Sequence, residues 1–255
     1  MTPVLLFVLF LSLSAIPPGA TDNEERQEFL DASDIIERAN ANITTSLVDG
    51  DIAPNRRRNA DPCTARGCKW PRYGRHVYVP IYISTRYTKT ERNIIIRALL
   101  TFHASTCIRF VWRKRHTNYL YFYSGSGCWS YLGRQSRGQL VSLQKNGCLY
   151  PQTVQHEVIH ALGFNHEQVR SDRNDYVSIN YQNIKRGKES NFRIRQTNNL
   201  GTPYDFDSIM HYGNYAFSKN RKPTIVANDD KSRIFGTART MSKNDIARVN
   251  KLYRC

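Results

Sequence analysis

Residues 156–166 read His-Glu-Val-Ile-His-Ala-Leu-Gly-Phe-Asn-His, and this run constrains the fold of the chain more than any other. His156 and His160 are four residues apart, so on a helix both imidazoles project from one face. Gly163 can adopt a left-handed conformation that ends the helix and turns the chain, which would bring His166 back as a third ligand. Three neutral imidazoles with an open fourth position are typical of a catalytic zinc site. An amphipathic helix that carries histidines by chance is the alternative interpretation.

Glu157 directly follows the first histidine and can hold a water molecule at the metal without being a ligand itself. A zinc ion held by imidazoles lowers the pKa of its water to about 7. Glu157 would accept the proton as the water attacks a carbonyl and would pass it to the departing amine. The motif therefore predicts acyl-bond hydrolysis with one zinc ion per subunit, and the third histidine after the glycine favours peptide bonds.

A second motif, Ser208-Ile209-Met210-His211-Tyr212, lies further along the chain. On a tight turn, Met210 would give the zinc site a soft apolar floor. Tyr212 offers a phenol that could reach the metal or the oxyanion. We expect His211 to pack within the turn, and the other histidines to be structural or exposed: His76, His103 and His116.

Residues 1–20 are typical of a secretory signal peptide, because an apolar run from Val4 to Leu13 is followed by small residues. No stretch is apolar for long enough to span a bilayer. An even number of cysteines agrees with export and predicts three disulfides, with fifteen connectivities open on spacing alone. The six are Cys63, Cys68, Cys107, Cys128, Cys148 and Cys255.

Charge divides the exported chain into two parts. Residues 21–58 carry five bases and nine acids, a net charge of −4, whereas residues 59–255 carry 32 bases and 12 acids, a net charge of +20. This division predicts an acidic activation propeptide that masks a basic catalytic domain with an anionic target. A basic surface that only keeps the protein soluble is the alternative. No nucleic-acid partner is expected, because the chain is exported and has no recognition motif.

A tribasic run, Arg56-Arg57-Arg58, ends the acidic part and predicts cleavage by a trypsin-like or furin-like protease before Asn59. A solvated charge cluster is the alternative. Asn42 begins an acceptor sequence for N-glycosylation, which fits a surface segment. The predicted organisation is thus a signal peptide at 1–20, a propeptide at 21–58 and one catalytic domain at 59–255.

Strands and helices of the catalytic domain are predicted from different sequence signals. Runs of β-branched and aromatic residues predict strands at 77–83, 107–112, 119–123 and 139–143. The first is expected at a sheet edge, because Pro80 cannot donate to a ladder. Capping boxes at Thr88 with Glu91 and at Ser242 with Asp245 begin helices, and apolar residues follow at helical spacing: Ile95, Leu99 and Phe102, then Ile246, Val249 and Leu252. With the histidine helix at 153–162, the pattern predicts an α+β fold in two lobes.

The pattern His-Glu-x-x-His-x-x-Gly-x-x-His-Glu, with Ser-x-Met-His-Tyr about 40 residues later, resembles the astacin family of metzincin zinc endopeptidases. The resemblance covers residues 59–255 and extends into the preceding segment. It implies a mixed β-sheet and the active-site helix in the N-terminal lobe, and a mostly irregular C-terminal lobe with a terminal helix. It also implies the following roles: zinc ligands His156, His160 and His166, general base Glu157, Met-turn residue Met210, and Tyr212 as a further ligand that swings to stabilise the transition state.

The same resemblance implies how the precursor is kept inactive. Val48-Asp49-Gly50-Asp51 matches a propeptide motif of the family, with valine in place of phenylalanine, and Asp51 would take the position of the water on the zinc. After cleavage, the new N-terminus would pair through water with Glu167. The implied disulfides are Cys107–Cys255 and Cys128–Cys148, and Cys63–Cys68 is expected as an additional pair.

The additional cysteine pair and the end of the chain at Cys255 resemble the fish hatching enzymes, which are choriolytic proteases of the egg envelope. The resemblance therefore implies a secreted, monomeric endopeptidase that leaves through secretory granules and cleaves egg-envelope glycoproteins. An astacin with a matrix or immune processing role is one alternative. A cationic binding protein with a vestigial metal site is another, and chelation would leave the function of such a protein intact.

Overall fold

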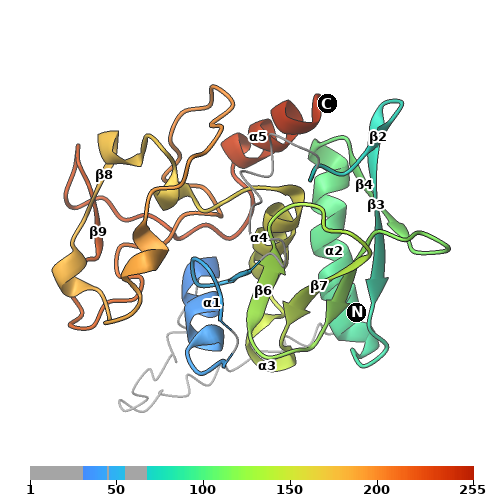
Figure 1. The fold of residues 1–255 in the computed structure, drawn as a ribbon, viewed down its shortest axis with the longest axis horizontal. Coiled ribbons are helices and arrows are strands. Elements are labelled where there is room, and N and C mark those ends of the chain that lie inside the picture. The colour runs from blue at the N-terminus through green and yellow to red at the C-terminus, as the bar shows by residue number, and fades with distance from the viewer. Residues whose placement is uncertain (1–30, 45, 55–67) are drawn as a thin grey trace, which may run out of the picture.

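The structure of the protein, a computed structural model, describes residues 31–44, 46–54 and 68–255. In Figure 1, one half of the molecule holds a large β-sheet with long helices. The other half holds a small sheet of β8 (Val177–Ile179) and β9 (Ile225–Ala227) among irregular segments. The predicted signal peptide at 1–20, the tribasic run at 56–58 and Cys63 lie outside the described residues.

Seven strands form the large sheet: β1 (Ile52–Ala53), β2 (Arg72–Tyr73), β3 (His76–Ile83), β4 (Ile108–Trp112), β5 (Tyr119–Tyr123), β6 (Cys128–Tyr131) and β7 (Gly138–Leu143). Their order is β1-β6-β7-β5-β3-β2, and β4 also pairs with β3. The sheet is mixed, because β2–β3 and β6–β7 are antiparallel and the other pairs are parallel. The expected α+β class with a mixed sheet is confirmed.

The prediction that 77–83 is an edge strand is wrong, because β3 has partners on both sides. Val77 N–H donates to Cys107, and the carbonyl of Ile81 accepts from Arg113, so odd-numbered residues of β3 bond to β4. The backbone nitrogen of Pro80 therefore points away from β4, toward the other hydrogen-bonding edge of β3. On that edge Pro80 falls between the end of the β2 ladder and the beginning of the β5 ladder at Ile81. The missing proline N–H costs no ladder hydrogen bond at that gap.

Two helices pack with the sheet in one hydrophobic cluster, α2 (Lys89–Ser105) and α4 (Pro151–Leu162). The capping box at Thr88 and the buried face of α2 are as predicted. Helix α4 begins two residues before the predicted start, because Pro151 occupies its first turn, where no N–H is needed. The short turn α3 (Lys145–Cys148) precedes it, and Cys148 is bonded to Cys128 of β6.

The C-terminal half has its own hydrophobic cluster, built around β8, β9 and the side chains of Phe192, Tyr204 and Phe235. The chain of this half also forms four 3-10 turns: η1 (Glu167–Val169), η2 (Arg173–Asp175), η3 (Tyr181–Asn183) and η4 (Glu189–Phe192). The last helix, α5 (Lys243–Tyr253), returns to the first cluster. The Cys107–Cys255 bridge ties the chain end to the start of β4, so both implied core disulfides are present.

The N-terminal segment, by which we mean the described residues 31–44 and 46–54, lies between the two halves (Figure 1). It contains α1 (Ala32–Asn40) and β1, which is parallel to β6. Ile35 and Ile36 of α1 are buried in the first cluster. Across the described ranges, no helix combines the length and the apolar character needed to cross a bilayer.

Candidate metal centre

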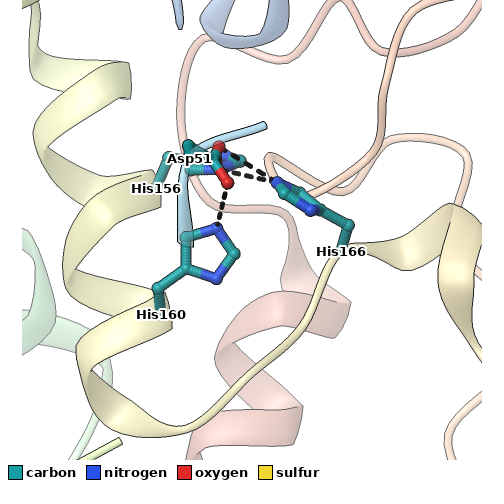
Figure 2. Close-up of side chains that lie close together, drawn as sticks. All are labelled: Asp51, His156, His160 and His166. Carbon is teal, nitrogen blue, oxygen red and sulfur yellow. Dashed lines mark hydrogen bonds and ion pairs between the residues drawn. The ribbon is translucent and has the colours of Figure 1, made fainter. Parts of the chain in front are cut away.

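Asp51 and the three histidines of the first motif meet at one buried point (Figure 2). One candidate ligand atom from each residue lies within 4.8 Å of all the others. Nε2 of His156 and Nε2 of His166 are each 3.1 Å from Asp51 Oδ2, and Nε2 of His160 is 3.4 Å from Asp51 Oδ1. The carboxylate therefore sits among the three imidazoles.

Helix α4 and its C-terminal turn set this geometry. His156 and His160 are one helical turn apart, and their ring centroids are separated by 4.7 Å. Gly163 ends the helix in the left-handed region, with φ at 113°, and its N–H donates to the His160 carbonyl at 2.8 Å. The chain then returns, so that the ring of His166 is 4.7 Å from that of His160. The predicted turn is confirmed.

Backbone carbonyls fix the tautomers of two of the imidazoles. Nδ1 of His156 lies 2.8 Å from the carbonyl oxygen of Ile209, and Nδ1 of His160 lies 2.7 Å from that of Phe164. Since a carbonyl oxygen only accepts, each Nδ1 carries the proton and each Nε2 presents a lone pair to the centre. Lone pairs and a carboxylate that converge on one point repel unless a cation lies between them. The donor set therefore fits a zinc ion.

The ionisation of these groups agrees with a metal site. Burial lowers the pKa of His166 to about 4, so its imidazole is neutral at neutral pH, as a metal ligand must be. Burial alone would raise the pKa of Asp51, but positive charge at the position of His166 and His160 outweighs burial and holds that pKa well below its usual value. With neutral imidazoles, a bound metal ion would supply this positive charge. Asp51 thus faces the site as a carboxylate.

Glu157 lies beside the centre and is 0 % exposed. Neither of its carboxyl oxygens has a hydrogen-bond partner among the described residues. Burial, together with the negative charge of Asp51, raises its pKa well above the usual value. A buried carboxyl whose pKa is raised holds a proton more readily than an exposed one, which suits a group that accepts a proton from water.

Met210 lies on a buried turn that α5 holds in place. Asp245, in the capping box of α5, accepts from Ser208 Oγ at 2.6 Å and from the Ile209 N–H at 3.0 Å. The carbonyl of Met210 accepts from the Glu167 N–H at 2.9 Å. The sequence identified Asp245 only as a cap, because its contacts with the turn join residues 36 and 37 positions apart.

Tyr212 is buried next to the cluster, and its ring centroid is 4.7 Å from that of His166. Its hydroxyl donates to the backbone carbonyl of Asp49 in the N-terminal segment. Burial, with the charges of Asp51 and Asp49, raises the pKa of the phenol well above its usual value. In this structure the phenol is therefore protonated and engaged by the N-terminal segment.

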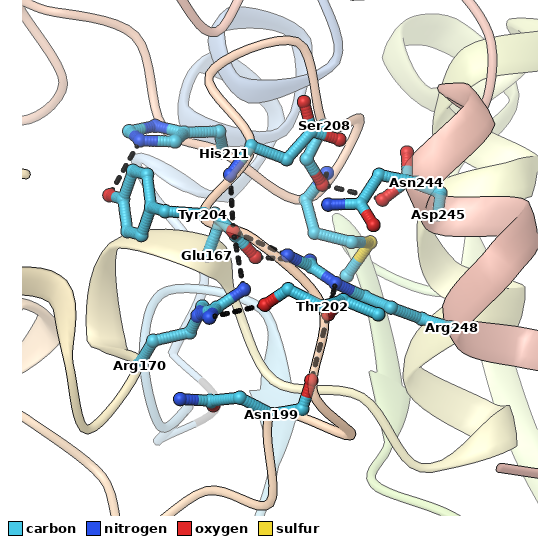
Figure 3. A network of polar contacts seen from close by, with 12 residues as sticks. Glu167, Arg170, Asn199, Thr202, Tyr204, Ser208, His211, Asn244, Asp245 and Arg248 are labelled. Atoms are coloured by element: carbon cyan, nitrogen blue, oxygen red, sulfur yellow. Dashed lines mark hydrogen bonds and ion pairs between the residues drawn. The ribbon is translucent and has the colours of Figure 1, made fainter. Parts of the chain in front are cut away.

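Glu167, the residue after His166, is buried in a polar network (Figure 3). Arg248 donates to both carboxylate oxygens, Arg170 lies 3.2 Å from Oε1, and the Asp205 N–H donates to the same oxygen at 2.8 Å. Both oxygens of the Glu167 carboxylate are thus paired within the protein. The two guanidinium groups supply the cationic partners that a buried glutamate needs, and sequence reasoning did not identify them.

The remaining histidines are structural or exposed, as predicted. His211 is buried, and its Nε2 accepts from the Tyr204 hydroxyl at 2.8 Å. Nε2 of His103 accepts from the Phe110 N–H at 2.8 Å. Cys68 is disulfide-bonded, but Cys63 lies outside the described residues, so the Cys63–Cys68 pairing stays a prediction.

Three side chains of the N-terminal segment make contacts that the sequence did not reveal. Glu37 pairs with Lys185 at 2.8 Å and accepts from the Phe217 N–H at 2.7 Å. Asn40 accepts from the Cys128 N–H at 2.8 Å, and Asp49 pairs with Arg195 at 2.6 Å. Their partners are 88 to 180 residues away, so no local pattern could have indicated them.

This geometry places the chain in the class of zinc metallopeptidases. The family model described as "Astacin", a peptidase family, matches residues 65–254. The protein therefore belongs to the astacin family and is a zinc metalloendopeptidase.

Relatives of known name agree with this assignment. The chain is 40% identical over 263 residues to "Low choriolytic enzyme" of Oryzias latipes, a match that covers 97% of both chains. It is 40% identical over 241 residues to "Astacin-like metalloendopeptidase" of Coturnix japonica, covering 93% of this chain and 58% of the relative. The solved structure of high choriolytic enzyme 1, a hatching enzyme zinc-protease from the medaka Oryzias latipes, superposes with a TM-score of 0.74 at 42% identity. That superposition covers 77% of this chain and 100% of the medaka chain.

Proposed function

We propose that the protein is a secreted endopeptidase made as an inactive precursor. In this proposal residues 1–20 are a signal peptide, residues 21–58 an activation propeptide and residues 59–255 the catalytic domain. One observation carries the proposal, namely the carboxylate of Asp51 among three imidazoles whose lone pairs face it. A carboxylate at that point occupies the place that a substrate or water needs.

His156, His160 and His166 would hold the zinc ion. When bound, zinc supplies a Lewis acid that polarises a carbonyl and makes water more acidic. Glu157 takes the proton of the attacking water and delivers it to the nitrogen of the departing amine. The Tyr212 hydroxyl, once it no longer donates to Asp49, can donate to the carbonyl oxygen on which negative charge develops.

Two features support latency of the intact chain and activation by cleavage. The N-terminal segment engages both the metal-facing point, through Asp51, and the Tyr212 hydroxyl. A protease that cuts between Arg58 and Asn59 would release it. The new N-terminal ammonium would then join the Glu167 network, where a cavity of about 50 Å³ is lined by Glu167 and Arg248.

The proposed substrates are egg-envelope glycoproteins, which the protein would meet as a monomer after release from secretory granules. The names of the choriolytic relatives and their coverage of nearly the whole chain support this choice. The excess of bases in residues 59–255 supports an anionic substrate surface. A matrix or immune processing role is the second candidate, because the chain also matches relatives whose names specify no egg-envelope substrate, such as the astacin-like metalloendopeptidases of Coturnix japonica and Gallus gallus.

The test is digestion by the activated protein of isolated egg envelopes and, in parallel, of matrix proteins, with the cut sites mapped by mass spectrometry. We expect discrete cuts in envelope proteins, their loss in phenanthroline and their return on addition of zinc. Cuts confined to matrix proteins would favour the second candidate. Activity that persists in phenanthroline would contradict the zinc mechanism.

Latency has a separate test. In a chain whose three arginines at 56–58 are replaced by serine, Asp51→Ala should release peptidase activity without any cleavage, whereas the same chain with Asp51 intact should stay inactive. Equal activity of the two uncut chains would disprove the role of Asp51. A fluorogenic peptide and an intact-mass measurement together give the result.

A further inference from the structure

The side of the large sheet that faces away from α2 and α4, which we call the outer face, carries a row of aromatic rings. Side chains alternate along a strand, so β3 buries Val77 and Val79 in the first hydrophobic cluster and turns Tyr82 to the outer face. The register of β3 and β5 places Tyr82 beside Tyr121. Neighbouring ring centroids are then 5.2 to 6.1 Å apart along the aromatic row, which consists of Tyr82, Tyr121, Tyr123, Trp129 and Tyr131.

The aromatic row is not part of the protein core. In the described part of the chain, neither hydrophobic cluster includes any of its five rings. Tyr82 is 41 % exposed, and Tyr121, Tyr123 and Tyr131 are half-buried. A large, flat aromatic surface that no other element covers is typical of a binding site.

Strand β3 also leads from the aromatic row to a hollow in the outer face. A cavity of about 530 Å³ opens where Pro80 separates the ladders of β2 and β5, and Tyr78 and Tyr73 add rings to its lining. Asn118 and Arg134 line the same cavity with polar groups. Aromatic surface interspersed with a few polar groups is the usual composition of a small-molecule or sugar site.

Charge favours an anionic ligand for this surface. Residues 68–155 carry 14 bases and one acid, a net charge of 14 − 1 = +13, so most of the +20 of residues 59–255 belongs to the half that holds the large sheet. The single acid is Glu91, which begins α2 and pairs with Lys145 at 3.3 Å. No acid therefore offsets the bases on the outer face, and the potential there attracts anions.

One of these bases is held directly on the aromatic surface. The guanidinium carbon of Arg113 lies 3.9 Å from the ring centroid of Tyr119, which is two residues before Tyr121 on β5. Arg113 Nε donates to the His116 carbonyl at 3.2 Å, which fixes the orientation of the guanidinium. Among the described residues no acid forms an ion pair with Arg113, so its charge stays available to a ligand.

Sugars fit this combination of rings and bases. One face of a sugar ring exposes C–H groups and packs flat on an aromatic ring, while its hydroxyls bond to polar groups around it. A carboxylate or sulfate on the sugar would pair with a guanidinium. Single-stranded nucleic acid can use the same side chains, but the proposed function places the enzyme among glycoproteins outside the cell.

We propose that the outer face of the large sheet is a second binding site, which takes acidic oligosaccharide chains of the glycoprotein substrate. The inference rests on the proposed function and deepens it. The aromatic row ends at Tyr131, whose ladder partner Ala53 lies two residues after Asp51, and the Ser130 N–H donates to the Asp51 carbonyl at 3.0 Å. A peptide that replaces this segment at the metal centre would carry an attached sugar chain toward the row.

The first experiment measures binding by calorimetry, with both the full chain and the activated enzyme. The probes are a sialylated N-glycan, the same glycan without its sialic acid, a sulfated oligosaccharide and an oligothymidylate. We expect at least one acidic sugar to bind about tenfold more tightly than the neutral glycan. Equal affinity for acidic and neutral sugars, absence of sugar binding, or tighter binding of the oligothymidylate would overturn the proposal.

Substitutions then locate the site. Tyr82→Thr removes an exposed ring but keeps a residue that favours strands, and it should weaken binding of the acidic sugar about tenfold, whereas Tyr82→Phe should retain binding. Arg113→Gln should weaken binding of the acidic sugar but not of the neutral one. Tyr215→Thr, at a ring that is 53 % exposed in the other half, and Arg97→Gln, at an exposed position of α2, are the matched controls and should bind as the wild type does.

Kinetics separate this proposal from the proposed function. The activated enzyme should cleave a peptide with an acidic glycan more efficiently than the same peptide without sugar. Tyr82→Thr should lower kcat/KM about tenfold for the glycopeptide and leave it unchanged for the bare peptide, which also shows that the variant is folded. An equal loss on both substrates would contradict the sugar site. If the activated wild type cuts neither peptide, the proposed function fails, while the binding measurements still decide the role of the outer face.

Discussion

Glu157 is the residue on which the proposed chemistry depends most, because it combines complete burial, unpaired oxygens and a raised pKa. Glu157→Gln keeps the size of the side chain but cannot accept a proton. We expect peptide cleavage by the activated protein to fall at least about 100-fold, with the zinc content unchanged. Zinc analysis of the purified variant and steady-state kinetics provide the check, and a variant that cleaves at the wild-type rate would exclude Glu157 as the general base.

His211 makes the stability of the chain depend on pH. Burial lowers its pKa to about 4, below the value of 6.5 expected in the unfolded chain. Between these values the unfolded state binds more protons, so stability is complete above pH 6.5 and is lost as the pH falls toward 4. The contribution of His211 to that loss should be about 2 kcal/mol between pH 7 and pH 5.

Urea denaturation of the wild type and of His211→Gln at both pH values measures this contribution. The variant should lose less stability on acidification than the wild type, whatever its stability at pH 7. His116→Gln, which removes an exposed histidine, is the control and should retain the wild-type slope. Identical slopes for all three proteins would show that His211 is not buried in its neutral form.

At the scale of elements, α5 does more than end the chain, since its capping residue Asp245 also holds the turn that carries Met210. Ser242→Ala removes the cap and should cost about 1 kcal/mol of the free energy of unfolding. Asp245→Ala also leaves Ser208 Oγ and the Ile209 N–H unpaired and buried, so it should cost about 2 kcal/mol more. Chemical denaturation of the two variants checks the difference, and equal costs would mean that the turn is stable without Asp245.

Helices and their caps could be predicted from the sequence because their signals are local. The capping boxes at Thr88 and Ser242 and the glycine after α4 act within a few residues, and all three are present as expected. Strand β3 was misplaced at an edge because the ladder positions of its neighbours depend on segments up to about 40 residues away. Strands β1, β8 and β9 have only two or three residues each, too few for any period to be recognised.

At the scale of the whole molecule, the N-terminal segment connects the two halves. Its Asn40 bonds to β6 in the first half, whereas Glu37 and Asp49 bond to Lys185 and Arg195 in the second. The histidine cluster could be predicted because two of its members share one helix face. The connecting contacts could not, because they depend on how the finished halves face each other.

Gly50→Ala tests how tightly this segment fits. A Cβ at Gly50 would meet Tyr212 and Phe217 and would adopt a strained φ. In the uncut serine variant, Gly50→Ala should therefore raise peptidase activity above the latent level. Gly74→Ala is the matched control, because Gly74 also has a positive φ but no atom within 4 Å of its Cβ position. A fluorogenic peptide assay decides, and equal activities would contradict a tight fit.

Strand β1 is an edge strand of the large sheet and is hydrogen-bonded to β6. If the proposed cleavage removes the segment that contains β1, the N–H and C=O groups of β6 that β1 now pairs become available to any extended chain. The mature enzyme would thereby gain a way to align unfolded or loosely structured polypeptide by its backbone alone. The exposed edge of β6 would also pair with flexible termini of other copies of the enzyme, and the enzyme would be able to cleave those termini.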